Sequence, residues 1–139
     1  MASADDLKAE GNQAFRDKNF SEAVRLFTAS LAENPSDALV LGNRAAAYDK
    51  LGRHTEAAAD AQKALQLDPT YLKGYFRLAT AHLSLGNAHE ALQAAEAGLK
   101  RQSANSQLRT LRDQAKQALE AMDDEEDDEE DDEDEDDEE

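Results

Sequence analysis

The sequence predicts an all-α protein: a solenoid of three helix-turn-helix repeats, then a C-terminal capping helix, then a disordered acidic tail. Three observations predict this architecture. The chain repeats itself every 34 residues, helix start and stop signals divide each repeat into two helices, and the last 17 residues are all acidic. A fixed period of this length is typical of stacked helical units, in which each unit packs on its neighbours.

The period is visible in residues that recur at fixed places. An offset of 34 places Asn34-Pro35 on Asp68-Pro69. The same offset aligns Ala23, Ala57 and Ala91, then Leu31, Leu65 and Leu99, then Glu22, Glu56 and Glu90. The predicted repeats are residues 4–37, 38–71 and 72–105. Three units are about the fewest that can bury a continuous core.

Capping residues and glycines set the ends of the predicted helices. Ser3 and Asn19 each stand three residues before an acid, which is a start signal because their side-chain oxygens accept from unpaired N–H groups. Gly52 and Gly86 are stop signals. The predicted helices are Ala4–Asp17, Phe20–Glu33, Asp37–Leu51, Thr55–Leu67, Tyr71–Leu85, Ala88–Arg101 and Ser106–Met122.

The last of these helices carries a single apolar face. That face is formed by Leu108, Leu111, Ala115, Ala118, Leu119 and Met122. We expect it to cover the open end of the third repeat, as the terminal element of a solenoid must. Residues 1–122 would then form one domain.

The charge of the chain lies in one segment. The net charge is −17, and residues Asp123–Glu139 are 17 consecutive acids. Removing those 17 from the 32 acidic residues leaves 15, which equals the 15 Lys and Arg, so the body is neutral. Because like charges repel and the run has no apolar residue to bury, we expect residues 123–139 to be disordered.

Composition excludes several kinds of site and location. The chain has no Cys, which excludes disulfides and thiolate metal sites and favours a reducing compartment, the cytoplasm or the nucleus. Residues 1–20 are rich in charge and hold no apolar run, which excludes a signal peptide or membrane span there. We expect a monomer with no cofactor, no metal, and no nucleic-acid or membrane partner.

Five donor side chains stand at spacings that place them on one surface: Lys8, Asn12, Asn43, Lys73 and Arg77. Residues four apart share a helix face, and residues one repeat apart stack on successive helices. Three cations and two amides would then face the same space. Such a set suits a peptide that ends in carboxylates, since each charge-assisted hydrogen bond contributes about 1.5–3 kcal/mol.

Three segments carry a resemblance to a known family: Lys8-Ala9-Glu10-Gly11-Asn12, Gly42-Asn43-Arg44-Ala45-Ala46-Ala47-Tyr48 and Lys73-Gly74-Tyr75-Phe76-Arg77-Leu78-Ala79. They resemble the dicarboxylate-clamp tetratricopeptide domains of chaperone cofactors, most closely the first such domain of the Hsp-organising (stress-inducible) co-chaperones. The resemblance covers residues 4–122 and includes all five clamp positions.

The resemblance implies a function and a role for each residue. Members of the family bind the C-terminal Glu-Glu-Val-Asp of the cytosolic seventy- and ninety-kilodalton heat-shock chaperones. By this match the five donors hold the two carboxylates of the last Asp. Phe15 and Ala46 border a pocket for the preceding Val, and Phe76 contacts residues further upstream. The match leaves open which chaperone is preferred.

Two other functions compete with this one. Catalysis would need a base, but His54, His82 and His89 are accompanied by no nucleophile order, phosphate loop or metal cluster, so we expect no enzyme. The acidic tail could instead attract basic proteins such as histones at low salt. It could also serve solubility alone.

Overall fold

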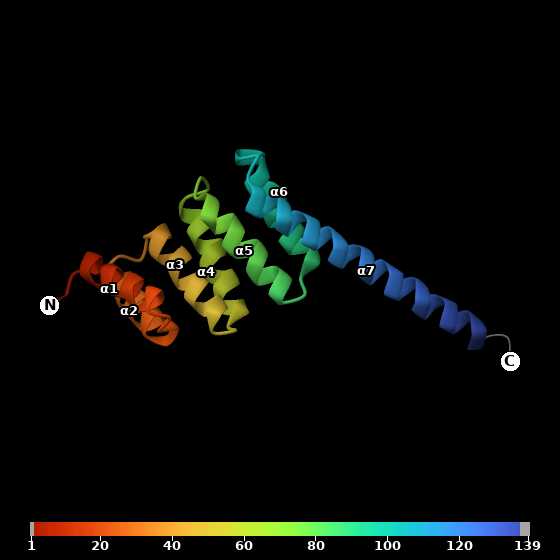
Figure 1. Cartoon of the computed structure of the whole chain (residues 1–139), viewed down its shortest axis with the longest axis horizontal. Coiled ribbons are helices and arrows are strands. Elements are labelled where there is room, and N and C mark those ends of the chain that lie inside the picture. The colour runs from red at the N-terminus through yellow and green to blue at the C-terminus, as the bar shows by residue number, and fades with distance from the viewer. Residues whose placement is uncertain (1, 137–139) are drawn as a thin grey trace.

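The computed structural model describes residues 2–136, and this part of the chain contains seven α-helices and no strand (Figure 1). The helices are α1 (Ala4–Arg16), α2 (Phe20–Glu33), α3 (Ala38–Lys50), α4 (His54–Leu67), α5 (Leu72–Ser84), α6 (Ala88–Arg101) and α7 (Ser106–Asp136). The all-α prediction is confirmed. Both ends of each of the first six helices lie within one residue of the predicted ends.

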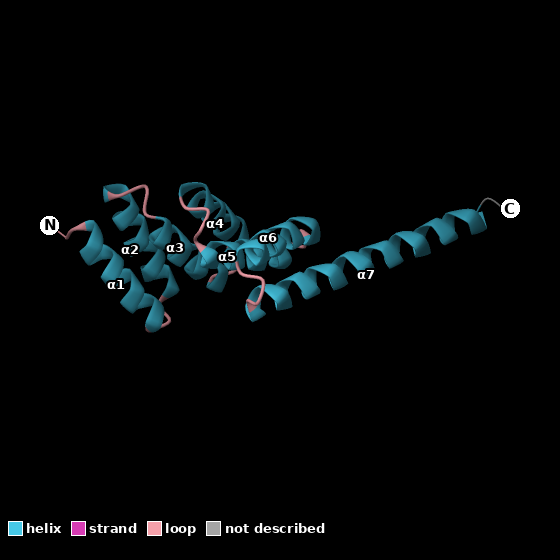
Figure 2. Cartoon of the chain, turned by 90° about the horizontal axis from the view of Figure 1, so that it is seen from above, coloured by secondary structure: helices cyan, strands magenta, loops and turns pink. Residues whose placement is uncertain are grey.

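The helices form antiparallel pairs that stack side by side along the molecule (Figures 1 and 2). Within the pairs, α1 packs against α2, α3 against α4, and α5 against α6. Contacts also join α1 to α3, α3 to α5, and α5 to α7. These four helices therefore line one side of the stack, which we call the inner side.

The paired helices approach most closely where side chains are small. A Cβ atom on Gly11 of α1 would stand 2.6 Å from the ring of Phe27 on α2. The equivalent positions in the next two units are Ala45 and Ala79, and both are buried. Short side chains at these places are what allow the helices to pack in register.

The side chain of Arg44 joins three helices through an ion pair and a hydrogen bond, away from the inner side. Arg44 on α3 donates two hydrogen bonds of 2.7 Å to the buried carboxylate of Asp60 on α4. A third bond, of 3.2 Å, reaches the hydroxyl of Thr28 on α2. The hydrogen bond to Asp60 raises the pKa of Arg44. Arg44 is therefore held toward the second helices of the first two units.

α7 differs from its prediction in length. Leu108, Leu111 and Ala115 are buried where it packs on α5 and α6, whereas Met122 is 46% exposed. Beyond the contact the helix continues through Asp136 and projects from the stack (Figure 1). The disorder predicted after Met122 is therefore not found for residues 123–136, and residues 137–139 lie outside the described part of the chain.

Helix continuity accounts for this difference. Starting a helix is costly, but each residue added to an existing helix gains a backbone hydrogen bond. The packed first turns of α7 supply that start, and the six Glu of residues 123–136 are good helix formers, unlike the eight Asp. The prediction considered the acidic run by itself, where like-charge repulsion has no such opposition. Long as it is, neither α7 nor any other described helix is apolar enough to cross a membrane.

The turn inside each unit places one residue in the left-handed region. Lys18, Gly52 and Gly86, one repeat apart, have φ values of 63°, 76° and 79°. Glycine adopts such a φ without strain, whereas a side chain at that φ costs about 1–2 kcal/mol. The first unit therefore carries strain that the other two avoid.

We predict that Lys18→Gly raises the free energy of unfolding by about 0.5–1 kcal/mol, the relieved strain minus the extra entropy that glycine loses on folding. Chemical denaturation measures this change. As a control, Lys63→Gly in the exposed middle of α4 should lower the free energy of unfolding by about 1 kcal/mol. A Lys18→Gly variant no more stable than the parent would show that the turn holds no strain.

Candidate functional site

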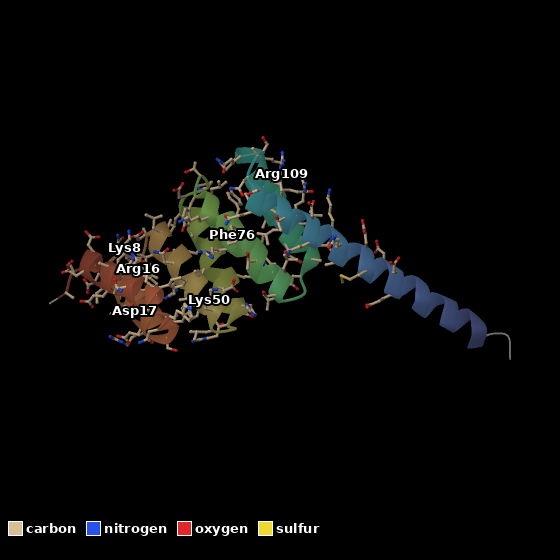
Figure 3. The ribbon with its side chains drawn as sticks, in the orientation of Figure 1. Lys8, Arg16, Asp17, Lys50, Phe76 and Arg109 are labelled. Carbon is tan, nitrogen blue, oxygen red and sulfur yellow. The ribbon has the colours of Figure 1, made fainter. Side chains whose placement is uncertain are left out.

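The five predicted donors come from three helices of the inner side. Lys8 and Asn12 lie on α1, Asn43 on α3, and Lys73 and Arg77 on α5. Four of these side chains are half-buried, and Lys73 is exposed. Figure 3 marks Lys8 near the N-terminal end of the stack. The repeat offset and the helical spacing together bring α1, α3 and α5 side by side, as the sequence predicted.

A cavity of about 140 Å³ opens between these helices, and we call it the inner cavity. It combines polar donors with an apolar wall, and its lining is Asn12, Phe15, Arg16, Phe27, Asn43, Ala46 and Arg77. Phe27 is fully buried on α2 and forms the floor. A hollow of this kind accepts a small apolar side chain beside a charged or polar group.

The two asparagines of the cavity are bonded to each other. Asn43 Nδ2 donates a hydrogen bond of 3.0 Å to Asn12 Oδ1, which joins α1 to α3. A side-chain amide has two N–H donors and an acceptor oxygen. Asn12 therefore retains its donors, and Asn43 retains a donor and an acceptor that can hold a peptide backbone.

Arg77 brings a positive charge to the cavity. Burial lowers the pKa of Arg77, and nearby Tyr71 and Asp49 oppose that effect. The guanidinium stays charged because its ordinary pKa lies far above neutrality. Its Cζ atom lies 5.3 Å from the centre of the Phe76 ring, a cation–π contact that holds the side chain. A charge that is partly shielded from water attracts an anion more strongly than an exposed one.

Lys8 lies one helical turn before Asn12 and faces a carboxylate of the same chain. Its Nζ atom is 3.8 Å from Oδ2 of Asp37. The other oxygen of Asp37 accepts hydrogen bonds from the backbone N–H groups of Leu39 and Val40, which caps α3. A separation of 3.8 Å is longer than a hydrogen bond, so a ligand carboxylate can compete for Lys8.

Lys73 lines a second hollow, which lies between α5 and the start of α7. Its volume is about 300 Å³, and its lining is Leu72, Lys73, Phe76, Asn105, Gln107 and Leu108. Phe76 thus links the two hollows: it lines the second one, and its ring contacts the guanidinium of Arg77, which lines the inner cavity. Figure 3 shows Phe76 on α5.

The structure gathers part of the predicted set at one place. The predicted residues that line the inner cavity are Asn12, Asn43, Arg77, Phe15 and Ala46. Lys8 and Lys73 each lie one helical turn before it, and Phe76 lines the second hollow instead.

Sequence reasoning missed three residues of the site. Phe27 has the pattern of a core residue, and nothing in the sequence indicates that it reaches the cavity. Arg16 is marked in Figure 3 further along α1 than Lys8. The one sequence feature that could have indicated it is its position next to Phe15, a predicted pocket residue. Asp37 is visible in the sequence as a cap, but its pairing with Lys8 depends on the packing of two units.

Comparison with known proteins identifies the repeat. The tetratricopeptide-repeat pattern matches residues 38–71, which are the second predicted repeat, and another form of the same pattern matches residues 61–93. The second tetratricopeptide domain of human RPAP3 is 34% identical to this chain, which covers 92% of that domain. The chain belongs to the tetratricopeptide-repeat family.

Its relatives within the family include heat-shock organizing proteins and a heat-shock co-chaperone. The chain is 41% identical over 105 residues to the Hsp70-Hsp90 organizing protein of Triticum aestivum, which is 76% of this chain and 18% of that protein. The chain spans less than a third of the length of the first curated relatives that it matches.

Two solved structures are similar to this one along most of their length. The first tetratricopeptide domain of Spaghetti (RPAP3), bound to the HSP90 peptide SRMEEVD, superimposes with a TM-score of 0.82 and 29% identity, covering 84% of this chain and 93% of that one. The second tetratricopeptide domain of human RPAP3, in complex with the HSP70 peptide SGPTIEEVD, superimposes with a TM-score of 0.77 and 34% identity. The match covers 79% of this chain and 92% of that one.

Proposed function

We propose that this chain is a non-catalytic co-chaperone module of the cytoplasm that binds the C-terminal Glu-Glu-Val-Asp of seventy- and ninety-kilodalton heat-shock chaperones. The observation that carries the proposal is the inner cavity, where Asn12, Asn43 and Arg77 meet an apolar wall. The two peptides held by the similar RPAP3 domains differ upstream and share the ending EEVD. Their common ending is what such a cavity can recognise.

The donors suit the two carboxylates of a terminal Asp. Arg77 and the two asparagines offer N–H groups at the cavity, and Lys8 and Lys73 add charge one turn earlier on α1 and α5. The terminal residue then lies toward the beginning of these helices. Charge-assisted hydrogen bonds at half-buried groups contribute about 1.5–3 kcal/mol each, more than bonds in open water.

The apolar part of the cavity suits the Val that precedes the Asp. Phe15, Phe27 and Ala46 form its walls, and its volume of about 140 Å³ admits a branched aliphatic side chain. Upstream residues of the peptide then run toward the ends of α1 and α3. Arg16 stands on that side and offers a cation to an acidic residue.

We predict that a peptide ending in Glu-Glu-Val-Asp binds with micromolar affinity, about −7 to −8 kcal/mol. Amidating its terminus should weaken binding at least tenfold. Arg77→Ala should cost about 2 kcal/mol, because a carboxylate in a half-dried site loses its partner. Lys73→Ala should cost less, about 0.5–1 kcal/mol, since Lys73 is exposed and water screens its charge. Isothermal calorimetry measures all four affinities.

Lys63→Ala, on the exposed face of α4, is the control for loss of one positive charge away from the site. It should bind the peptide like the parent. Equal affinity of the parent for the acid and the amide peptide would rule out a carboxylate clamp.

We also propose that the first turns of α7 act as the cap of the stack. Leu108 is 1% exposed, and a Cβ atom on Gly98 of α6 would stand 2.7 Å from its Cδ1 atom. Leu111 and Ala115 continue the contact. Each large apolar side chain covered in this way contributes about 1.5–3 kcal/mol.

We predict that ending the chain after Met122 leaves the melting temperature nearly unchanged, because the contact with α5 and α6 ends before that residue. Ending it before Asn105 should lower the melting temperature strongly, since it uncovers the third repeat. Circular dichroism melts of both truncated chains test the cap. A large loss of stability on removing only residues 123–139 would mean that the acidic segment packs on the body.

A further inference from the structure

Three of the four inner helices begin with a residue whose side chain caps the helix, and α5 does not. Ser3, Asp37, Tyr71 and Asn105 are 34 residues apart, and each stands directly before the first residue of an inner helix. The side chains of the other three accept a hydrogen bond from a backbone N–H of the helix that follows. Tyr71 makes no such bond to α5, so the start of this helix has no side-chain cap.

The side chain of Tyr71 reaches across to α3 instead. Its hydroxyl oxygen would stand 2.3 Å from a Cβ atom on Gly42, so only glycine leaves room for it. Gly42 directly precedes Asn43, which lines the inner cavity. The phenol oxygen therefore lies against the backbone of α3, next to a predicted donor.

Two charged groups of the site, Arg77 and Asp37, act on this hydroxyl. Burial raises the pKa of Tyr71, and of the nearby charges Arg77 lowers it while Asp37 raises it. Arg77 lines the inner cavity, and Asp37 is the partner of Lys8. The hydroxyl thus lies near Arg77 of the cavity and near Asp37, the partner of Lys8, while Tyr71 itself is not among the residues that line the inner cavity. A phenol with a raised pKa keeps its proton at neutral pH and can donate it to an acceptor.

The hydroxyl has no use within the part of the chain that the structure describes. Tyr75, four residues further on, donates a hydrogen bond of 2.8 Å to the carbonyl of Pro69 and accepts one from Arg101. No hydrogen bond joins the Tyr71 hydroxyl to any group of residues 2–125, the part of the chain whose side chains are described. The chain thus leaves α5 without a side-chain cap, as it does α4 and α6, and keeps a glycine in α3 where the ring and the hydroxyl of Tyr71 pack. Broken local rules of this kind mark functional positions.

We propose that the hydroxyl of Tyr71 is a sixth donor, which binds the terminal α-carboxylate of the peptide. The proposal rests on the function proposed above and names a further residue of the same site. A neutral phenol donates an O–H···O⁻ bond without bringing a charge that must itself be stripped of water. It also favours a carboxylate over an amide, because a hydrogen bond to a charged oxygen is about twice as strong as one to the neutral amide oxygen.

Tyr71→Phe tests the proposal because it removes one oxygen atom and keeps the ring. We expect the variant to bind the free-acid Glu-Glu-Val-Asp peptide about tenfold to a hundredfold more weakly than the parent, the effect of one hydrogen bond to a charged group. Binding of the C-terminally amidated peptide should change less than twofold. The melting temperature should not fall, since the hydroxyl bonds to no described residue.

Tyr75→Phe is the matched control, with the same substitution on the same helix. It loses the bond to Pro69, so its melting temperature should fall while its affinity for the acid peptide stays within twofold of the parent. A ¹³C label on the tyrosine rings gives a second readout. The signal lost in Tyr71→Phe should be the one that shifts when the parent binds the acid peptide.

The outcomes separate this inference from the function on which it rests. If the parent binds the acid peptide and Tyr71→Phe binds it equally well, the hydroxyl is not a donor and the inference is wrong. It is wrong too if the variant weakens acid and amide peptides alike, since the hydroxyl would then act on a part of the peptide that both share. If the parent binds neither peptide, the proposed function itself fails.

Discussion

The close approach of paired helices at small residues is the constraint on which the rest of the structure depends. A single methyl group on Gly11 would meet the ring of Phe27, and the equivalent Ala45 and Ala79 are buried. These contacts set how far apart the two layers of helices lie, and the 34-residue period repeats that spacing. The donors on α1, α3 and α5 are therefore placed relative to one another by packing that involves none of them.

The sequence was sufficient for what depends on period and helical spacing. Asn12 and Phe15 share a face of α1, and Asn43 and Arg77 lie one repeat apart. Their meeting follows from the 3.6 residues of a helical turn and the 34 residues of the repeat. It was insufficient where a side chain crosses between units. The contact of Tyr71 with Gly42 depends on rotamers and on the exact fit of neighbouring helices, which no period encodes.

The acidic segment shows the limit of composition as a guide. Taken alone, residues 123–139 offer nothing to repay ordering, and composition predicts disorder. Attached to a helix whose first turns are packed, residues 123–136 extend it. Whether this segment attracts basic proteins stays a prediction, since the structure holds no partner. The neutral body of the chain and its charged extension are separate parts, because the packed face of α7 ends before Met122.

The hydrogen bond between Asn43 and Asn12 has a consequence for the dynamics of the stack. Repeat proteins lose structure most easily at their terminal units, which have a neighbour on one side only. This bond links the terminal unit to the middle one at the wall of the cavity, and Arg77 adds the third unit. An occupant of the cavity would thus fasten all three units, and fraying of α1 and α2 would have to release it first. Amide hydrogen exchange in α1 and α2 would then slow when the cavity is occupied.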